Sequence, residues 1–324
     1  MDYFQYQDDR LFAEEVDLNH IAEAVGTPCF VYSRRTLERH WHAFDQAFGD
    51  YPHSICYAVK ANGNLAILSL LGKLGSGFDI VSGGELKRVM AAGGTPDKTI
   101  FSGVCKLDWE IRDALRQGIG SFNIESEGEL EKLIAVSREL GKRPQISVRI
   151  NPDVDAQTHP YISTGLKSNK FGLSPERARA VYRQAHKDDN IQVHGVACHI
   201  GSQLTELSPY MDALRRVLEF VDSLEEEGIE IHGIDFGGGL GVRYMDEAPP
   251  SPAEYWDAIH GLLAARPKQI PVTIEPGRAI VANAGILLTR VHYLKAGAET
   301  NFCMVDAGMN DLIRPALYLS IIHI

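Results

Sequence analysis

Short apolar runs alternate with longer segments of helical periodicity along most of the chain. The short runs are rich in β-branched and aromatic residues, which favours buried strands, and the longer segments repeat apolar positions every three to four residues. Eight strands are predicted in this way: Ser54–Val59, Phe78–Val81, Thr99–Ser102, Ser121–Ile124, Gln145–Ile150, Val193–His199, Ile231–Phe236 and Val272–Glu275. Helices are predicted between them: Leu65–Leu74, Gly84–Ala92, Leu107–Gln117, Glu127–Leu140, Pro175–His186, Pro209–Glu227 and Pro252–Ala265.

Local signals agree with these helix boundaries. Pro175 and Pro252 each follow a serine, the usual order of an N-cap and the first helical residue. Gly118, Gly141 and Gly228 stand where C-terminal caps belong. Strands that alternate with helices are typical of a parallel sheet, either a closed barrel or an open doubly wound sheet.

The two chain ends depart from this alternation. A short helix is predicted at Leu18–Val25, a strand at Phe30–Tyr32 and a long helix at Arg34–Phe48, all before the first barrel strand. After the eighth strand, Ile280–Leu294 and Phe302–Asp306 read as strands with no helix between them. The ends are therefore expected to form a separate β-rich part.

The pattern as a whole predicts an α/β fold with two domains. The first, residues 33–278, is a (β/α)8 TIM-like barrel that binds the cofactor discussed below. The second, residues 1–32 together with 279–324, is a β-rich domain that is incomplete in this chain.

Composition narrows the range of partners. The chain has 324 residues, of which 44% are hydrophobic, and a formal net charge of -11, which argues against nucleic acid or an anionic membrane as the main partner. No apolar stretch reaches the roughly 18–20 residues of a membrane span, and the N-terminus has no secretory signal. The cysteines do not have metal-ligand spacing, so no metal is expected. They are expected to be reduced, buried thiols in a cytoplasmic protein. The cysteines are Cys29, Cys56, Cys105, Cys198 and Cys303.

Residues with chemical potential follow four of the predicted strands. Lys60 ends the first strand, His199 follows the sixth, the run Gly237–Gly239 follows the seventh, and Glu275–Arg278 follows the eighth. The carboxyl ends of barrel strands meet at one face, where barrel enzymes place their sites. These residues are therefore expected to share one cavity.

Each of these features has a chemical and a purely structural interpretation. Glycine backbone at Gly237–Gly239 can approach a phosphate closely, although a flexible turn needs glycine too. Lys60 at the end of an apolar strand is expected to be partly desolvated, which lowers the pKa of an amine and frees it to attack a carbonyl. Its alternative is a lysine that reaches solvent.

Three further positions complete the expected site. Glu275 can accept a hydrogen bond from a protonated pyridine nitrogen, although an ion pair with Arg278 is the simpler interpretation. His199 can stack on a pyridine ring or be a buried structural histidine. Asp79 and Arg149, which also end strands, could orient the ring and the histidine, and a barrel-internal ion pair is an equal alternative. A lysine, a phosphate loop and a pyridine-facing carboxylate together predict pyridoxal 5'-phosphate.

At these residues the chain resembles the barrel-type pyridoxal-phosphate amino-acid decarboxylases, and within them the diaminopimelate decarboxylases. The resemblance runs from about Asp17 to Tyr318. It rests on the following motifs: YAVKAN around Lys60, FDIVSGGEL at Phe78–Leu86, HPYISTGLKSNKFG at His159–Gly172, HIGSQ from His199, the GGGLG loop, EPGR from Glu275, and DAGMNDLIRPALY at Asp306–Tyr318.

The resemblance implies a role for each matching residue. Lys60 would be the Schiff-base lysine and His199 the ring-stacking residue, both catalytic. The implied cofactor ligands are Lys60, His199, Ser202, Gly237, Gly238, Gly239, Glu275, Pro276, Gly277 and Arg278. Arg278, Arg314 and Tyr318 would hold the distal carboxylate of the substrate, because guanidinium groups suit a carboxylate and a diamine precursor would need an acid there.

By this resemblance the chain is a cytoplasmic, homodimeric carboxy-lyase that converts meso-2,6-diaminopimelate into L-lysine and CO2. Relatives continue past the position of Tyr318 with a Cys-Glu-Ser stretch and a later tyrosine that act in catalysis, whereas this chain ends in the apolar run Leu319–Ile324. A truncated or frame-shifted chain of low turnover, with open strand edges that favour aggregation, is therefore expected. The alternatives are a non-catalytic cofactor-binding or subunit-sequestering protein, a racemase, and a decarboxylase of another basic amino acid.

Overall fold

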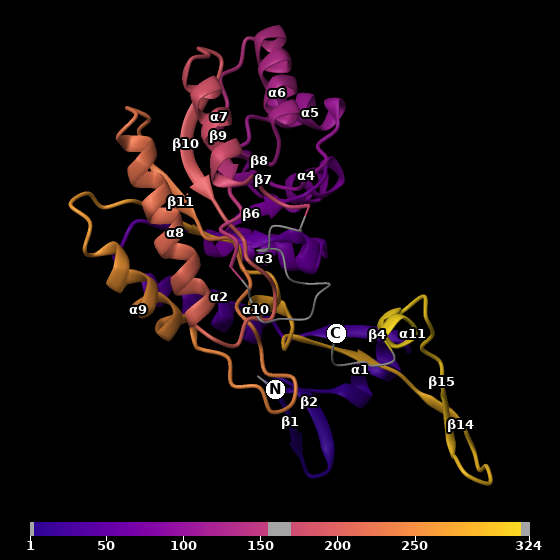
Figure 1. The fold of residues 1–324 in the computed structure, drawn as a ribbon. Helices are drawn as coiled ribbons and strands as arrows, with labels where there is room; N and C mark the ends of the chain where they lie inside the picture. The colour runs from indigo at the N-terminus through magenta and orange to yellow at the C-terminus, as the bar shows by residue number, and fades with distance from the viewer. Residues whose placement is uncertain (1–2, 155–169, 319–324) are drawn as a thin grey trace. The chain divides into compact units, whose positions relative to one another are not determined.

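Eight parallel strands close into a barrel in the computed structural model, which describes residues 3–154 and 170–318 (Figure 1). Consecutive strands are neighbours around the barrel, and the last one pairs with the first through Val272 and His53. The closed barrel is the predicted fold and excludes the open sheet. Its strands are β5 (His53–Ala58), β6 (Gly77–Ile80), β7 (Thr99–Phe101), β8 (Ser121–Ile124), β9 (Gln145–Arg149), β10 (Gln192–Ala197), β11 (Gly233–Asp235) and β12 (Val272–Ile274).

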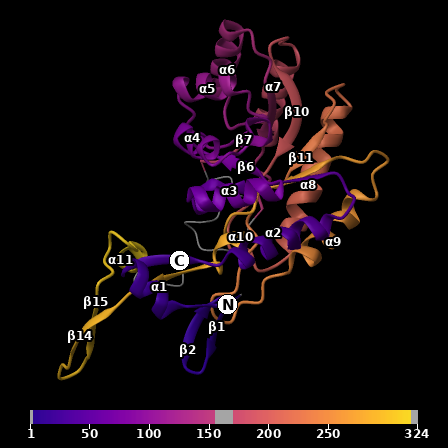
Figure 2. The same cartoon turned by 180° about the vertical axis from the view of Figure 1, so that it is seen from behind.

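A helix follows each barrel strand, and the longer helices α3 to α9 lie around the outside of the barrel (Figures 1 and 2). These helices are α3 (Leu65–Leu74), α4 (Gly83–Ala91), α5 (Asp108–Gln117), α6 (Glu127–Leu140), α7 (Pro175–His186), α8 (Ser208–Glu225), α9 (Pro252–Leu263) and the short α10 (Arg278–Val281). Two 3-10 turns, η1 (Val59–Ala61) and η2 (Pro96–Lys98), lie at opposite ends of strands. Each predicted helix between strands is present, with boundaries shifted by at most two residues.

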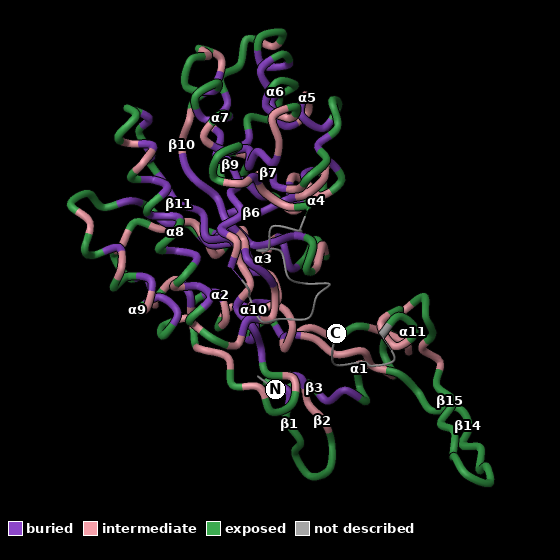
Figure 3. The backbone as a smooth tube through the Cα atoms, viewed as in Figure 1, coloured by how far each residue is buried: buried purple, intermediate pink, exposed green. Residues whose placement is uncertain are grey.

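Helix α6 illustrates how local sequence sets these elements. Leu130, Leu133 and Ile134 are buried at helical spacing, so one face packs on the barrel. Burying each such side chain stabilises the fold by about 1.5–3 kcal/mol. The helix begins where the hydroxyl of Ser126 accepts the N–H of Glu129. Figure 3 shows the result, with buried barrel strands and helices that alternate between buried and exposed faces.

The predicted cap residues are largely in place. The hydroxyl groups of Ser174 and Ser251 cap α7 and α9, and a proline follows each of them. Gly118 and Gly141 are the C-caps of α5 and α6 in the left-handed conformation. Gly228 is an exception, because α8 ends earlier and this glycine lies beyond its cap.

The chain divides into two compact units, residues 41–242 with 248–279, and residues 1–40 with 243–247 and 280–324. The second of these units joins both chain ends, since β4 (Cys29–Tyr32) pairs with β13 (Gly285–Leu288). Its other elements are β1 (Phe4–Gln7), β2 (Arg10–Ala13), β3 (Val16–Asp17), α1 (Leu18–Val25), the start of α2 (Arg34–Phe48), β14 (Val291–Lys295), β15 (Phe302–Val305) and α11 (Arg314–Tyr318). A domain boundary at residues 33 and 278 stays a proposal.

Packing explains why the chain ends come together. Phe4, Ala13 and Leu18 form a small core, and Val31 from the beginning of the chain and Ile286 from its later part pack against it. The predicted continuous strand Ile280–Leu294 is wrong, because this run contains the end of α10 and two separate strands. Short apolar runs do not distinguish a buried helix from a strand, which is why periodicity failed here.

The cysteines differ from the prediction. Cys56 and Cys198 are buried, whereas Cys105 and Cys303 are exposed, so the expectation of uniformly buried thiols is wrong. Cys105 lies in the loop after β7, where no strand buries it. Among the described residues no helix is long and apolar enough to cross a membrane.

Candidate active site

A cavity of about 390 Å³ lies at the carboxyl ends of the barrel strands. It is large enough for a small cofactor, since small-molecule sites usually measure roughly 300–1,000 Å³. Nine of the residues predicted for the site line it: Lys60, Asp79, Arg149, His199, Ser202, Gly239, Glu275, Gly277 and Arg278. The barrel topology therefore brings together side chains that lie more than 200 residues apart in the sequence.

Lys60 lies on η1, directly after β5, and bonds to a buried carboxylate. Its Nζ donates to Oδ2 of Asp79 at 2.6 Å, and Asp79 on β6 is fully buried. The lysine side chain is 50% exposed, so it borders the cavity without being enclosed. Oδ1 of Asp79 is buried and has no hydrogen-bond partner within the described residues, so this carboxylate can accept a further donor.

The predicted lowering of the lysine pKa is wrong. Burial does lower the pKa of Lys60, but the negative charges of Asp79 and Glu275 outweigh it, and the net pKa is raised. The amine is therefore held as an ammonium by its neighbours. Its ability to attack a carbonyl depends on loss of that proton, and Asp79 is the nearest acceptor.

Close packing explains the glycines that follow β11. Gly237 and Gly239 have φ of +64° and +113°, which side chains rarely adopt, and a Cβ on Gly238 would lie 2.2 Å from the carbonyl oxygen of Glu275. The N–H of Gly237 donates to Oδ1 of Asp235, and that of Gly238 donates to Nδ1 of His199. Gly239 is thus the member of the run that lines the cavity.

His199 is held in a defined protonation state. Since its Nδ1 accepts the N–H of Gly238 at 3.2 Å, the neutral ring carries its proton on Nε2. Burial, followed by the positive charges of Arg149 and Lys60, lowers the pKa of His199 well below its usual value. A neutral, fixed imidazole suits stacking on an aromatic ring, and that role stays a prediction.

Glu275 lies in a buried polar group that the sequence did not suggest. Its Oε1 lies 3.4 Å from both Ser102 Oγ and Asn123 Nδ2. Burial, and then the charges of Asp235 and Asp79, raise the pKa of Glu275 well above its usual value. This carboxyl group therefore tends to hold a proton until a positive group comes close.

The remaining predicted residues make structural contacts as well. Arg149 forms a buried ion pair with Glu125, Nη1 to Oε1 at 2.8 Å, and its Nη2 donates to the carbonyl oxygen of His199 at 3.4 Å. Arg149 and Asp79 therefore each belong to an ion pair inside the barrel, Arg149 with Glu125 and Asp79 with Lys60. Arg149 also holds the backbone of His199 through its hydrogen bond. Arg278 donates from Nε to Ser202 Oγ at 3.3 Å.

Some predicted positions lie elsewhere. Pro276 borders a small cavity behind the glycine run together with Gly237 and Gly238. Arg314 and Tyr318 belong to α11, in the other unit of the chain, and the motif His159–Gly172 falls almost entirely outside the described residues, as does the apolar run after Tyr318.

Sequence reasoning missed Ser102, Asn123 and Asp235, although each borders the cavity. Each one is a polar residue in or directly after an otherwise apolar barrel strand. The interior of a barrel is closed to solvent, so a polar position there needs a partner, and this was the available signal.

The protein class is identified by comparison with known families. Residues 34–282 match the family model of the pyridoxal binding domain of pyridoxal-dependent decarboxylases. This match and the cavity define a pyridoxal-phosphate-dependent decarboxylase. The amine of Lys60, the glycine backbone at Gly239 and the carboxyl group of Glu275 are the groups that this cofactor needs, and they border one cavity of suitable volume.

The particular family follows from the relatives. The diaminopimelate decarboxylase of Vibrio cholerae is 60% identical over 98% of this chain and 76% of its own length, and that of Haemophilus influenzae is 54% identical over 100% and 78%. The crystal structure of the Helicobacter pylori enzyme complexed with L-lysine has a TM-score of 0.89 at 41% identity, covering 94% of this chain and 76% of that one. The chain belongs to the diaminopimelate decarboxylase family, as predicted.

Proposed function

We propose that this chain holds pyridoxal 5'-phosphate on Lys60 and removes CO2 from meso-2,6-diaminopimelate to give L-lysine. The observation that carries the proposal is the meeting of Lys60, Gly239 and Glu275 at one cavity, in a chain 60% identical to a diaminopimelate decarboxylase. Because the amine, the glycine loop and the carboxyl group come from β5, β11 and β12, only the closed barrel brings them together.

Each residue has a distinct task in this proposal. When bound, pyridoxal phosphate supplies a ring that takes up the electron pair of the breaking bond between Cα and the carboxylate. Lys60 would bind the aldehyde carbon and leave when the substrate amine replaces it, and Asp79 would keep its Nζ within reach. Glu275 would face the pyridine nitrogen, and Gly239 would meet the phosphate.

The substrate assignment rests on arginine chemistry. Arg278 borders the cavity and presents a planar guanidinium, which can bind a carboxylate through two parallel hydrogen bonds. Arg314 and Tyr318 are proposed to contribute to the same carboxylate. A diamine precursor such as ornithine carries an ammonium in that place, and Arg278 would repel it.

We further propose that the chain works in the cytoplasm as a homodimer. The relatives named above are bacterial biosynthetic enzymes, and the family resemblance favours a dimer. Sedimentation equilibrium of the purified chain over a range of concentrations tests the dimer, and a monomer at every concentration would contradict it.

Two measurements on the same preparation test the function. The chain is incubated with pyridoxal phosphate, reduced with borohydride and digested, and the labelled peptide is identified by mass. Separately, CO2 release is measured from meso-diaminopimelate, L-lysine and L-ornithine. We expect the label on Lys60 and release from diaminopimelate in preference to the other two.

Two matched lysine variants test whether the labelling is specific to Lys60. Lys60→Ala should abolish labelling, whereas Lys98→Ala should not, because Lys98 lies at the opposite end of the barrel, where its Nζ donates to the carbonyl oxygen of Gly75. Labelling of Lys60 without CO2 release would support the non-catalytic alternative. Absence of labelling would refute the cofactor assignment.

A further inference from the structure

Two buried carboxyl groups share one amide donor beneath the cofactor cavity. Asn123 Nδ2 donates to Oδ2 of Asp235 at 3.0 Å and lies 3.4 Å from Oε1 of Glu275. Asp235 at the end of β11 is 6% exposed, and Glu275 directly after β12 is 9% exposed. The amide of Asn123 therefore joins Asp235 to the carboxyl group proposed to face the pyridine nitrogen.

The second oxygen of Asp235 reaches the glycine loop. Its Oδ1 accepts the N–H of Gly237 at 2.8 Å. One carboxylate thus connects the backbone that would hold the phosphate with the side chain that would face the ring. The glycine backbone and Glu275 would contact opposite ends of the cofactor, so a substitution at Asp235 is expected to alter both contacts.

The charges around this pair are unbalanced. Lys60 bonds to Asp79, Arg149 pairs with Glu125, and the buried Lys106, whose Nζ also donates to the carbonyl oxygen of Asn123, pairs with Glu129, so each of these cations already serves another carboxylate. Arg278 lines the same cavity and donates to Ser202. The cavity at the amino ends of the strands is also lined by His42, Asp45, His53, Asp97 and Lys98. The groups with a shifted pKa that interact with the two carboxyls or line the same cavities include Cys56, Cys198, His199, His194 and Tyr255. The pKa of His199 is lowered, that of His194 is lowered, and those of the thiols and of Tyr255 are raised, so these groups are neutral at neutral pH.

This environment leaves a proton on the pair in the absence of cofactor. Burial raises the pKa of Asp235, although hydrogen bonds from Glu275 and Gly237 oppose the rise. Burial and the neighbouring charges of Asp235 and Asp79 raise the pKa of Glu275 further. A raised carboxyl pKa means that the proton is still bound at a pH where an exposed carboxyl group has lost it.

We propose that Asp235 is a positioning residue, which acts through Asn123 and Glu275 to supply a second negative charge behind the pyridine nitrogen and so to keep that nitrogen protonated. The inference rests on the proposed function, because it requires Glu275 to face the ring. The proton balance is simple: one O–H bond of the carboxyl pair breaks and one N–H bond of the ring forms. Both carboxylates are then negative opposite a cation.

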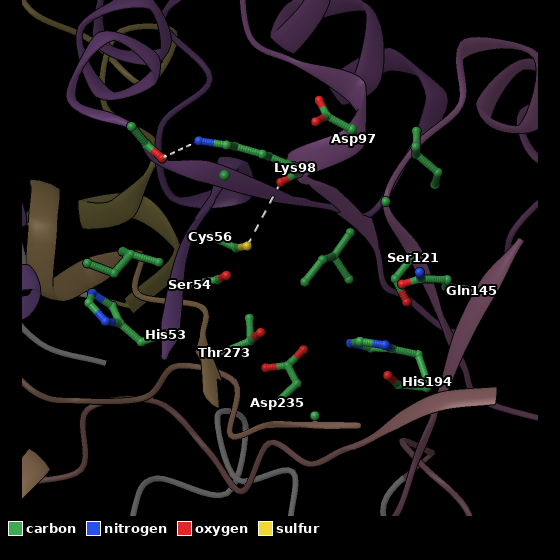
Figure 4. Close-up of a pocket in the computed structure, with 18 of the residues that line it drawn as sticks. His53, Ser54, Cys56, Asp97, Lys98, Ser121, Gln145, His194, Asp235 and Thr273 are labelled. Atoms are coloured by element: carbon green, nitrogen blue, oxygen red, sulfur yellow. Dashed lines mark hydrogen bonds between the residues drawn. The ribbon is translucent and has the colours of Figure 1, made fainter. Parts of the chain in front are cut away.

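Asp235 and Asn123 also line a second cavity, of about 900 Å³, among the amino ends of the strands. Figure 4 shows Asp235 there, with Thr273 and His194 around the same space. Exposed residues such as Lys98 border this cavity, so Asp235 lies between the two cavities, whereas Glu275 lines the one at the carboxyl ends of the strands.

The test uses pyridoxal phosphate labelled with nitrogen-15 in the ring, bound to the full chain. The chemical shift of that nitrogen reports directly whether it is protonated, and it is followed as a function of pH. An opposite charge at close range shifts a pKa by about 1–3 units. We therefore expect the midpoint of ring titration to fall by about 1–3 pH units in Asp235→Asn, while the native chain keeps the nitrogen protonated through the neutral range.

Two further variants separate charge from structure. In the exchanged pair Asn123→Asp with Asp235→Asn, the same hydrogen bond is reversed and the negative charge returns to the cluster, so the midpoint should move back toward the native value. Thr273→Val removes a hydroxyl group from the neighbouring strand without a change of charge and should leave the midpoint unaltered.

The outcomes are distinct. A midpoint unchanged in Asp235→Asn overturns the inference, even if that variant binds the cofactor more weakly. If Asp235→Asn does not bind at all, the exchanged pair decides, and its failure to recover ring protonation also overturns the inference. If the native chain forms no bond between Lys60 and the cofactor, the proposed function fails instead.

Discussion

The ion pair between Lys60 and Asp79 gives a prediction whose sign can be worked out from the structure. Asp79→Asn keeps the shape of the side chain and removes its charge. The carboxylate is fully buried and lies 2.6 Å from Nζ, and together with Glu275 it raises the pKa of Lys60 against the lowering effect of burial. Removing the charge therefore lowers the pKa of Lys60.

The expected magnitude follows from the closeness of the pair. An opposite charge within about 4–6 Å typically shifts a pKa by 1–3 units, so a fall of about 1–3 units is expected. Half of the lysine side chain is exposed, which favours the lower end of this range, because solvent weakens the interaction. Only the neutral amine attacks an aldehyde, so the reactive fraction at neutral pH should increase by about tenfold or more.

The assay is the rate at which Lys60 bonds to pyridoxal phosphate, followed by rapid-mixing absorbance across a range of pH. The midpoint of the rate profile should move to lower pH in Asp79→Asn. Asp108→Asn is the control, since Asp108 pairs with Arg112 on the exposed surface of α5 and should leave the profile unchanged. A midpoint that stays in place or rises in Asp79→Asn would refute the argument that Asp79 keeps the amine protonated.

Two other variants or treatments test the packing of the site. Gly238→Ala places a Cβ 2.2 Å from the backbone oxygen of Glu275, which costs about 1–3 kcal/mol, so pyridoxal phosphate should bind roughly 5- to 150-fold more weakly by fluorescence titration. Gly128→Ala, with no atom within 4 Å of the new Cβ, should bind normally, and equal losses in both variants would disprove the steric argument. Burial raises the pKa of Cys198 to about 12, so iodoacetamide at neutral pH should label exposed Cys105 in the folded chain and reach Cys198 only after denaturation.

Local sequence signals were sufficient for most of the barrel. The helix Glu127–Leu140 has a serine cap, a left-handed glycine and an apolar face, three signals that agree, and the structure places it at the same residues. The run Ile280–Leu294 lacked such signals, and its division into a helix and two strands depends on pairing with β4 and β15, which a linear pattern does not contain.

Position along the chain was sufficient to predict which residues line the same cavity. Lys60 and His199 stand out because they end strands, and parallel strands in a barrel end on one side. Asn123 and Asp235 lie within strands, where alternation suggests a side chain that faces outward to solvent. In a closed barrel the alternate positions face inward, so these polar side chains meet across the interior, and this depends on the tertiary fold.

The distribution of buried charge indicates where a cation belongs. Arg149 is paired with Glu125, and to break such a buried pair costs about 3–5 kcal/mol, so Arg149 is held in place by the fold. Lys60 is paired with Asp79, but its half-exposed side chain makes this pair weaker. Glu275 differs, because its close polar neighbours include a second acid, and a buried pair of like charges is favourable only if it shares a proton or receives a positive group. A protonated pyridine ring is such a group. The like charges that destabilise this part of the barrel would thus be the ones that attract a cationic ring.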